Sequence, residues 1–281
     1  MLATPASASL HCAARTATKR HLLMCPPVHF EVSYSINPWM DVDAPVDPDR
    51  AMAQWSTLRD CYRNLGHSVK TVDPAPGLPD MVFAANAAVV HNGQVLVANF
   101  THPERQGESA AYRGWFEASG FNPVLTASYQ NEGQGDVLAV GGVMLAGTGF
   151  RTSVAAHEEL RDFFGVPVVT LELVDPRFYH LDTALAVLDD HSIAYFPGAF
   201  SSSSVSTLEE LFPDSILVDE IDACAFGLNA MSDGFNVVLS DRARTLQEEL
   251  RRRGFNPIGV DMSELLKAGG SAKCCTLELR A

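Results

Sequence analysis

Apolar and polar positions follow one pattern that returns along the chain. Four times, a pair of short apolar runs joined by turn residues is typical of a β-hairpin, and an amphipathic stretch typical of a helix follows. The hairpins are predicted over residues 82–100, 136–150, 183–200 and 226–240. The helices are predicted over residues 103–120, 154–164, 206–212 and 243–254. Short strands are expected after the last three helices, over residues 166–173, 215–221 and 256–262.

The polar residue that opens each hairpin marks the period of this pattern. These residues are separated by 50, 46, 47 and 46 positions, and they are Asn86, Asp136, Asp182, Asn229 and Cys275. A period of about 47 residues indicates an internal repeat of hairpin, helix and strand. Because one such unit cannot bury its own apolar face, five units are expected to pack around a common axis. The fifth hairpin would be completed across the chain ends, with residues 20–27 pairing near residues 274–279.

The N-terminal part departs from the repeat. Residues 29–50 predict an irregular loop, and residues 49–65 show the apolar spacing of a helix that stops at Gly66. The first twenty residues are rich in alanine, serine and threonine, contain no acids, and have no apolar core of a secretory signal. Their composition resembles a transit segment, but we expect residues 1–20 to be a disordered or over-long extension. Residues 21–281 are expected to form one domain.

Composition narrows the class of partner. A formal net charge of −14 disfavours nucleic acid and anionic membranes, which bind basic faces, and suits a cationic small molecule. No apolar run reaches the ~20 residues needed to cross a bilayer. Six cysteines among 281 residues are too few for a disulfide framework, which favours a reducing cytoplasm. The sequence leaves open whether the chain forms a homo-oligomer.

Candidate chemistry begins at the C-terminal stretch GGSAKCCTLEL, which we expect to place Cys274 and Cys275 on a short apolar strand. A cysteine acts as a nucleophile only as the thiolate, so it needs a base or cation nearby. Composition alone favours the plainer interpretation, in which both cysteines are small buried hydrophobic side chains. Only partners elsewhere in the chain can reverse that preference.

The repeat supplies such partners, because its register brings several polar side chains to one place. They are Asn86, Glu132, Asp136, His180, Asp182 and Cys274. A cysteine with a histidine and acids is the arrangement needed for nucleophilic attack and protonation of a leaving group. Each residue alone is weak evidence, since a lone histidine is often structural and an aspartate in a turn is often a cap. Their common register strengthens the prediction of an active site.

Four motifs carry a resemblance to a known family: PDMVFAANA, EGQGD, FYHLDT and GGSAKCC. They resemble the guanidine-modifying enzymes of the pentein fold, which comprise arginine deiminases, dimethylarginine dimethylaminohydrolases, amidinotransferases and arginine dihydrolases. The resemblance runs from about Arg20 to the C-terminus. It implies a five-bladed α/β propeller and a covalent thiouronium mechanism without metal or organic cofactor. It also implies that Cys274 is the nucleophile, that His180 is the general acid and base, and that Glu132 and Asp182 anchor the guanidinium.

The resemblance extends to residues expected to bind substrate. Arg105 and Arg151 match arginines that bind the α-carboxylate or brace the site, although both could be surface arginines. Asn37, within SINPWM, resembles the arginine dihydrolase branch. The expected substrate-binding set is Asn37, Asn86, Arg105, Asp136, Arg151 and Asp182.

One position separates the family branches. At the position of Asn86, deiminases and dimethylarginine hydrolases resemble each other in having an aspartate. This chain has an asparagine there and in this respect resembles the dihydrolases. An amide can donate a hydrogen bond to a neutral ureido oxygen, so a citrulline-like intermediate could be retained and attacked again. This favours conversion of arginine to ornithine, carbon dioxide and two ammonia. Dimethylarginine hydrolysis is the main alternative, followed by amidinotransfer and by a non-catalytic ring like that of a ribosome anti-association factor.

Overall fold

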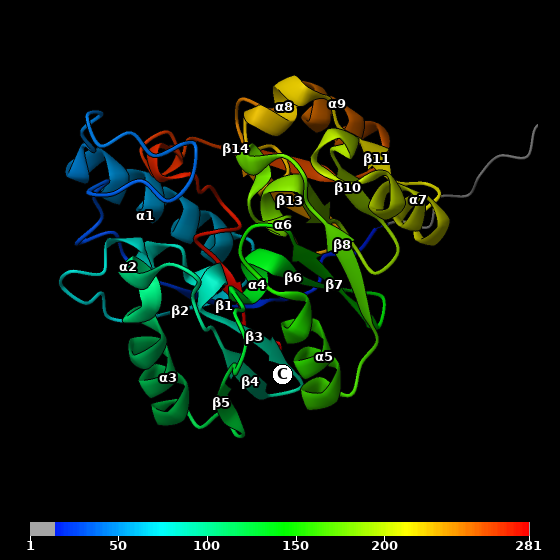
Figure 1. The fold of residues 1–281 in the computed structure, drawn as a ribbon. Coiled ribbons are helices and arrows are strands. Elements are labelled where there is room, and N and C mark those ends of the chain that lie inside the picture. The colour runs from blue at the N-terminus through cyan, green and yellow to red at the C-terminus, as the bar shows by residue number, and fades with distance from the viewer. Residues whose placement is uncertain (1–14, 281) are drawn as a thin grey trace, which may run out of the picture.

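The computed structural model describes residues 15–280 and contains five three-stranded sheets built to one plan (Figure 1). In four sheets the middle strand pairs antiparallel with the strand before it and parallel with the strand that follows a helix. In the fifth sheet β1 is the middle strand, and its antiparallel partner is the last strand, β15. The sheets are β3-β4-β5, β6-β7-β8, β9-β10-β11, β12-β13-β14 and β15-β1-β2. The predicted repeat of hairpin, helix and strand is therefore confirmed at the level of an α/β fold.

The strands within residues 15–280 are β1 (His21–Met24), β2 (Ser68–Thr71), β3 (Ala88–His91), β4 (Gln94–Val97), β5 (Val124–Thr126), β6 (Val137–Val140), β7 (Val143–Thr148), β8 (Val168–Glu172), β9 (Leu185–Val187), β10 (Ile193–Tyr195), β11 (Ile216–Leu217), β12 (Met231–Ser232), β13 (Asn236–Ser240), β14 (Asn256–Val260) and β15 (Leu277–Glu278). The α-helices are α1 (Pro48–Asn64), α2 (Pro103–Gln106), α3 (Glu108–Ala118), α4 (Gly133–Asp136), α5 (Val154–Phe164), α6 (Leu181–Ala184), α7 (Ser202–Leu211), α8 (Glu220–Cys224) and α9 (Arg244–Arg252). The 3₁₀ turns are η1 (Pro79–Val82), η2 (Ala84–Ala87), η3 (Pro176–Phe178), η4 (Pro197–Ala199) and η5 (Leu265–Ala268).

The two ends of the chain complete the fifth sheet. Leu22 of β1 pairs with Glu278 of β15 in antiparallel register, and the other edge of β1 pairs in parallel with β2. This confirms the predicted pairing of the first strand with the C-terminal strand. Residues 1–14 of the expected extension lie outside the described residues. Residues 15–20 run along the fold, and the backbone nitrogen of Thr18 donates to the carbonyl of Asp233 at 2.8 Å.

The longer helices lie around the outside of the molecule and cover the sheets, as Figure 1 shows for α1, α3, α5, α7 and α9. Each buries one apolar stripe. In α1 the stripe consists of Trp55, Leu58 and Tyr62, spaced as the helical period requires. Burying one such side chain contributes about 1.5–3 kcal/mol. None of the helices formed by residues 15–280 combines the length and the apolar character needed to cross a membrane.

Several predicted boundaries are wrong for local reasons. The helix expected over residues 103–120 divides at Gly107, where a β-carbon would lie 3.0 Å from Cδ2 of Leu78. The strand expected over residues 215–221 ends at Leu217, because Asp219 caps α8 by accepting from the backbone nitrogen of Asp222. Helix α7 begins at Ser202 rather than residue 206, since Ser201 provides its cap.

The largest differences fall where the hairpins open. Residues expected at the start of a strand instead form short helical turns, η2, α4 and α6, which are too short to leave a periodic signal. Cys274 and Cys275 lie in a turn that precedes β15, not on the strand. In that turn the backbone nitrogen of Cys275 donates to the carbonyl of Ser271 at 3.1 Å. On a strand, successive side chains point to opposite faces of the sheet. The short turns instead allow neighbouring polar side chains to point in other directions.

Candidate active site

Cys274 lies at the centre of contacts from three other repeats. Its Sγ is 3.4 Å from Oδ2 of Asp182, and Nδ2 of Asn229 donates to it at 3.0 Å. Its backbone carbonyl accepts from the nitrogen of Ala85 at 3.0 Å. The side chain of Cys274 is 2% exposed. The cysteine is therefore held by segments that are far apart in sequence.

Two glycines allow the chain to reach this position. Gly269 has φ of 80°, a left-handed conformation that favours glycine. A β-carbon at residue 269 would also lie 2.8 Å from the hydroxyl of Tyr179, and one at residue 270 would collide with the ring of Phe83. The glycine pair identified in the sequence therefore serves close packing as well as a turn.

His180 and Glu132 form the second part of the site. Nε2 of His180 is 2.7 Å from Oε2 of Glu132, and Nη1 of Arg151 donates to the same oxygen at 2.9 Å. The backbone nitrogen of Thr101 donates to the other oxygen at 3.2 Å. Burial alone would raise the pKa of Glu132, but Arg151 and His180 hold that pKa well below its ordinary value. Glu132 is therefore a carboxylate that orients the imidazole.

The EGQGD loop packs tightly against the FAAN segment. Gly133 has φ of 58°, and a β-carbon there would lie 2.7 Å from the carbonyl oxygen of Asn86. A β-carbon at residue 135 would collide with Nδ2 of Asn86 and lie 3.3 Å from Cγ of His180. Gly135 thus keeps open the space that Asn86 and His180 share.

The amide of Asn86 is oriented by a buried arginine. Nη1 of Arg105 donates to Oδ1 of Asn86 at 2.8 Å, while Nε and Nη2 donate to the two carboxylate oxygens of Glu108. Nδ2 of Asn86 has no hydrogen-bond partner among residues 15–280. Arg105 is 3% exposed and Arg151 is 5% exposed, so the surface interpretation of these two arginines is wrong.

Two predicted substrate ligands have their polar atoms occupied by the protein. Oδ1 of Asp136 accepts from the backbone nitrogen of Leu181, and Oδ2 accepts from the backbone nitrogen and hydroxyl of Thr152. Asn37 donates to the carbonyl of Ala268 and accepts from the backbone nitrogen of Trp39. Both side chains hold segments of the site together.

Burial sets the protonation of the groups around the sulfur. It raises the pKa of Asp182 to about 7, although the ammonium of Lys273 opposes the shift. Burial and the neighbouring Asp182 raise the pKa of Cys274 well above its ordinary value. Burial and Asp182 thus both favour the neutral thiol over the thiolate.

Two residues of the site were not assigned from the sequence. Asn229 was identified only as the opening residue of a repeat, yet it touches the sulfur of Cys274. Asp80 is 1% exposed, accepts from the hydroxyl of Tyr34 at 2.9 Å, and has no partner for Oδ1 among residues 15–280. The repeat register could have identified Asn229, because this residue opens a hairpin at the same position as Asn86, Asp136 and Asp182. Asp80 lies within the PDMVFAANA motif that carries the family resemblance, but no role was assigned to it.

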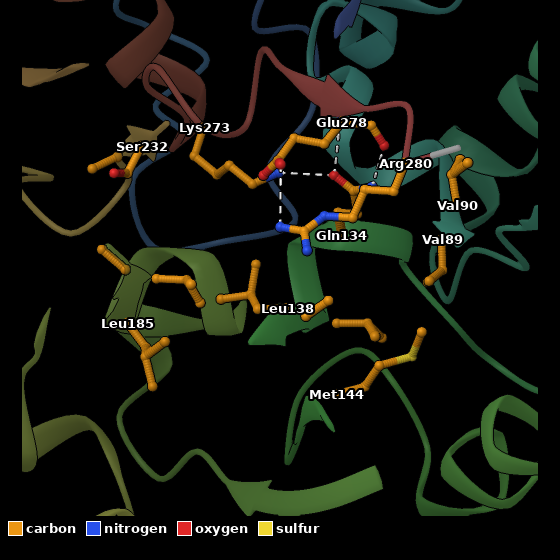
Figure 2. Close-up of a pocket in the computed structure, with 15 residues that line it drawn as sticks. Val89, Val90, Gln134, Leu138, Met144, Leu185, Ser232, Lys273, Glu278 and Arg280 are labelled. Carbon is orange, nitrogen blue, oxygen red and sulfur yellow. Dashed lines mark hydrogen bonds and ion pairs between the residues drawn. The ribbon is translucent and has the colours of Figure 1, made fainter. Parts of the chain in front are cut away.

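Figure 2 shows a narrow cavity whose wall includes Lys273, the residue before Cys274. It is lined by residues from the first strand of every sheet or next to it, which are Val89, Leu138, Ala186, Ser232 and Glu278, among others. At one wall, Nζ of Lys273 donates to Oε1 of Gln134 and to the carbonyl of Thr276, both at 3.0 Å. Cys274, His180 and Glu132 are not among its lining residues, although Lys273 and Gln134 of its wall are close in sequence to Cys274 and Glu132. Within residues 15–280, no group of three or more His, Cys, Asp or Glu side chains is arranged to hold a metal ion.

Comparison with known proteins defines the class. Residues 36–200 match the family described as N,N dimethylarginine dimethylhydrolase, eukaryotic. The chain is 57% identical over 267 residues to the N(G),N(G)-dimethylarginine dimethylaminohydrolase of Mycobacterium tuberculosis, covering 95% of this chain and 88% of that protein. The chain belongs to this family of hydrolases, which confirms the resemblance found in the sequence.

The chain is also similar to the arginine dihydrolase branch. It is 39% identical over 264 residues to the bifunctional arginine dihydrolase/ornithine cyclodeaminase ArgZ of Synechocystis sp., which covers 92% of this chain but only 37% of that longer protein. The N-terminal domain of ArgZ, crystallised as a cysteine-to-serine variant bound to substrate, matches 93% of this chain and 98% of that chain with a TM-score of 0.89 and 38% identity. A structure of an asparagine-to-serine variant of that domain is covalently bound to a reaction intermediate.

Proposed function

We propose that this enzyme hydrolyses the guanidino group of arginine in two successive steps through Cys274 and releases ornithine, carbon dioxide and two ammonia. The observation that carries the proposal is the amide of Asn86. Its Oδ1 is held by Arg105, and its Nδ2, which has no partner among residues 15–280, lies against the same glycine as His180. A hydrogen-bond donor at this place can hold a neutral ureido group as well as a guanidinium.

The first step is formation of the thiolate in the presence of substrate. A guanidinium beside Asp182 would be held by a charge-assisted contact next to the sulfur of Cys274. Its positive charge opposes the effects of burial and of Asp182, so it lowers the pKa of the thiol when it binds. Holding the planar cation against the thiolate also supplies the orientation that attack on a poor electrophile requires.

The covalent step follows from the position of His180. The proton of the Cys274 thiol passes to His180, and Sγ forms a bond to the guanidinium carbon. The C–N bond then breaks with its electron pair going to nitrogen, and His180 gives its proton to that departing nitrogen. Glu132 holds Nε2 of the imidazole, so Nδ1, which has no partner among the described residues, is left for proton transfer. His180 then takes a proton from water as the water attacks the S-linked carbon, and the C–S electron pair returns to sulfur.

The second turnover depends on Asn86. After the first hydrolysis the product is neutral, and an ionised carboxylate at this position could only accept hydrogen bonds. The free Nδ2 of Asn86 instead donates to the ureido oxygen and retains the intermediate for a second attack by Cys274. In that attack the second ammonia leaves, water hydrolyses the S-linked thiocarbamate, and the resulting carbamate loses carbon dioxide to give ornithine. The covalently bound intermediate in the asparagine-to-serine variant of ArgZ supports a role for an asparagine during that enzyme's reaction.

The remaining predicted ligands have supporting roles in this proposal. Arg105 orients Asn86, and Arg151 orients Glu132 while its Nη2 donates to the carbonyl of Ile36. Asp136 and Asn37 brace the surrounding turns. Asp80, with Oδ1 unoccupied, is a further buried acid that can accept a hydrogen bond from a cationic group of the substrate.

We also propose that the five sheets form the blades of a propeller in a single domain over residues 21–281. The support is the cavity of Figure 2, to which the first strand of every sheet contributes. Five strands can line one narrow cavity when their sheets are arranged around a common axis. A cytoplasmic location stays a prediction from the cysteine content.

Hydrolysis of dimethylarginine is the second candidate function. It is favoured by the 57% identity to the mycobacterial protein named for that activity. This alternative would give citrulline and a methylamine in one step.

Product analysis on three substrates side by side separates the two candidates. Purified enzyme is incubated with arginine, citrulline and dimethylarginine, and amino acids, ammonia and methylamines are quantified. The proposal expects ornithine and ammonia from arginine. Release of methylamine from dimethylarginine without turnover of arginine would contradict it and support the alternative. Cys274→Ser serves as the control for contaminating activity.

A further inference from the structure

The side chain of Asn229 makes four hydrogen bonds that fix its orientation. Oδ1 accepts from the backbone nitrogens of Cys274 at 3.0 Å and Ser271 at 3.1 Å. Nδ2 donates to the carbonyl of Asp182 at 3.1 Å and to Sγ of Cys274 at 3.0 Å. Asn229 is fully buried. Because three of these partners are backbone groups with fixed polarity, the amide cannot be flipped, and its second N–H must point at sulfur.

This contact distinguishes the two ionisation states of the sulfur. A thiol is a weak hydrogen-bond acceptor, whereas a thiolate is a charged acceptor that binds an N–H donor much more strongly. The other close polar neighbour of Sγ is the carboxylate of Asp182, which disfavours the thiolate. Asn229 therefore supplies a neutral donor that favours the charged form in a buried setting.

We propose that Asn229 is a catalytic residue that stabilises the Cys274 thiolate both as nucleophile and as leaving group. This inference rests on the proposed function. When the S–C bond to the substrate carbon forms, sulfur loses its negative charge and the hydrogen bond weakens. When water attacks and the C–S bond breaks, the electron pair returns to sulfur and the N–H of Asn229 stabilises it again. Donors placed where charge develops contribute substantially to rate.

A purely structural role makes a different prediction. Asn229 also holds the turn at Ser271 and Cys274 through Oδ1, so its loss could simply misplace the cysteine. Asn229→Asp keeps the contacts that hold the turn, because an aspartate oxygen can still accept from the backbone nitrogens of Ser271 and Cys274. Its other oxygen, when ionised, donates neither to sulfur nor to the carbonyl of Asp182. The Asn256→Asp variant is the matched control, since it makes the same chemical change on β14 at an exposed position.

Thiol labelling measures this effect without substrate. The rate of alkylation of Cys274 by iodoacetamide is followed by peptide mass mapping from pH 7 to 10. Cys61, a partly exposed thiol on α1, serves as the reference within the same molecule. The ratio of Cys274 to Cys61 labelling should fall by about 10- to 100-fold in Asn229→Asp and stay unchanged in Asn256→Asp. An unchanged ratio in a folded Asn229→Asp protein would overturn the proposal.

A second measurement uses the unsubstituted side chain and needs no reagent access. The side-chain ¹⁵N–H₂ resonances of Asn229 are followed by NMR as pH is raised, in wild type and in Cys274→Ser. The proposal expects a shift that follows ionisation of the sulfur and is lost in Cys274→Ser. Identical titrations in the two proteins would contradict it.

Both measurements are independent of turnover. If arginine is not hydrolysed but the labelling ratio and the resonance shift as expected, the proposed substrate is wrong and the role of Asn229 stands. If arginine is hydrolysed but neither measurement responds, only the role of Asn229 fails.

Discussion

The sulfur of Cys274 lies between a carboxylate that disfavours its charge and an amide that favours it. Burial further disfavours the thiolate by raising the pKa of the thiol. Under the proposed function, a bound cationic guanidinium shifts this balance toward the thiolate. Reactivity is thereby coupled to the charge of the ligand at the scale of single residues.

The first prediction distinguishes the two adjacent cysteines. Cys274→Ser should abolish turnover, because Sγ of Cys274 contacts the site, whereas Cys275→Ser should retain most of it. The side chain of Cys275 is fully buried, whereas Asp182 and Asn229 converge on Sγ of Cys274. Steady-state rates and mass mapping of a trapped adduct measure this. Label on Cys275, or full activity in Cys274→Ser, would refute the assignment.

The second prediction concerns proton transfer. His180→Ala should slow turnover by about 10² to 10⁴, since the imidazole held by Glu132 serves both the leaving nitrogen and the attacking water. Rapid-quench measurement of the adduct should show that its formation and its decay are both impaired. Turnover near that of the wild type would mean that another group transfers the protons.

At the scale of elements, short helical turns position the polar side chains of the site. The pattern of apolar residues in the sequence could not predict these turns. The alternation of apolar residues predicted the hairpins, and the helical period predicted α5 with its observed bounds. The four-residue turns at η2, α4 and α6 carry no period of their own. Their shape depends on packing between loops that are distant in sequence, as at Gly133 and Gly135.

The third prediction tests that packing. Gly135→Ala should reduce kcat by at least about tenfold, because the added methyl group collides with the amide of Asn86 and crowds His180. Gly114→Ala is the control, since a β-carbon at that position in α3 meets nothing within 4 Å. Kinetics and thermal unfolding of both variants decide the matter. Equal activity of the two variants would show that the EGQGD loop accommodates the added methyl group without loss of activity.

At the scale of the whole molecule, the repeat was the strongest signal in the sequence. The spacing of the opening residues predicted five similar units and the pairing of β1 with β15, because stacking of repeats is encoded along the entire chain. The same register indicated where the side chains converge. The register did not assign a role to Asp80. It also could not show that the carboxylate oxygens of Asp136 accept hydrogen bonds from Leu181 and Thr152, because those contacts depend on rotamers and on backbone turns.

The fourth prediction concerns stability as a function of pH. The folded state raises the pKa of Asp182 from 3.8 to about 7, so it binds the proton more tightly than the unfolded chain does. That contribution to the free energy of unfolding is complete below pH ~4 and is lost as pH rises toward 7. Asp182→Asn cannot ionise, so its loss of stability over this range should be smaller than that of the wild type by about 1 to 4 kcal/mol.

Denaturant unfolding of wild type and Asp182→Asn at pH 4.5 and pH 8 measures this difference. Asp136 and Glu108, whose pKa values burial raises to about 6 and about 7, give the wild-type slope the same sign and remain in the variant. Parallel pH profiles for the two proteins would mean that Asp182 is ionised in the folded enzyme throughout this range.

The most direct test of the account is the ratio of ammonia to ornithine formed from arginine by the wild type and by Asn86→Asp. The account predicts two ammonia for each ornithine from the wild type, because the amide of Asn86 retains the neutral intermediate for a second attack. The variant should release citrulline with one ammonia, because an ionised carboxylate cannot donate to the ureido oxygen. Citrulline as the sole product of the wild type, or ornithine formed equally by both proteins, would contradict the account.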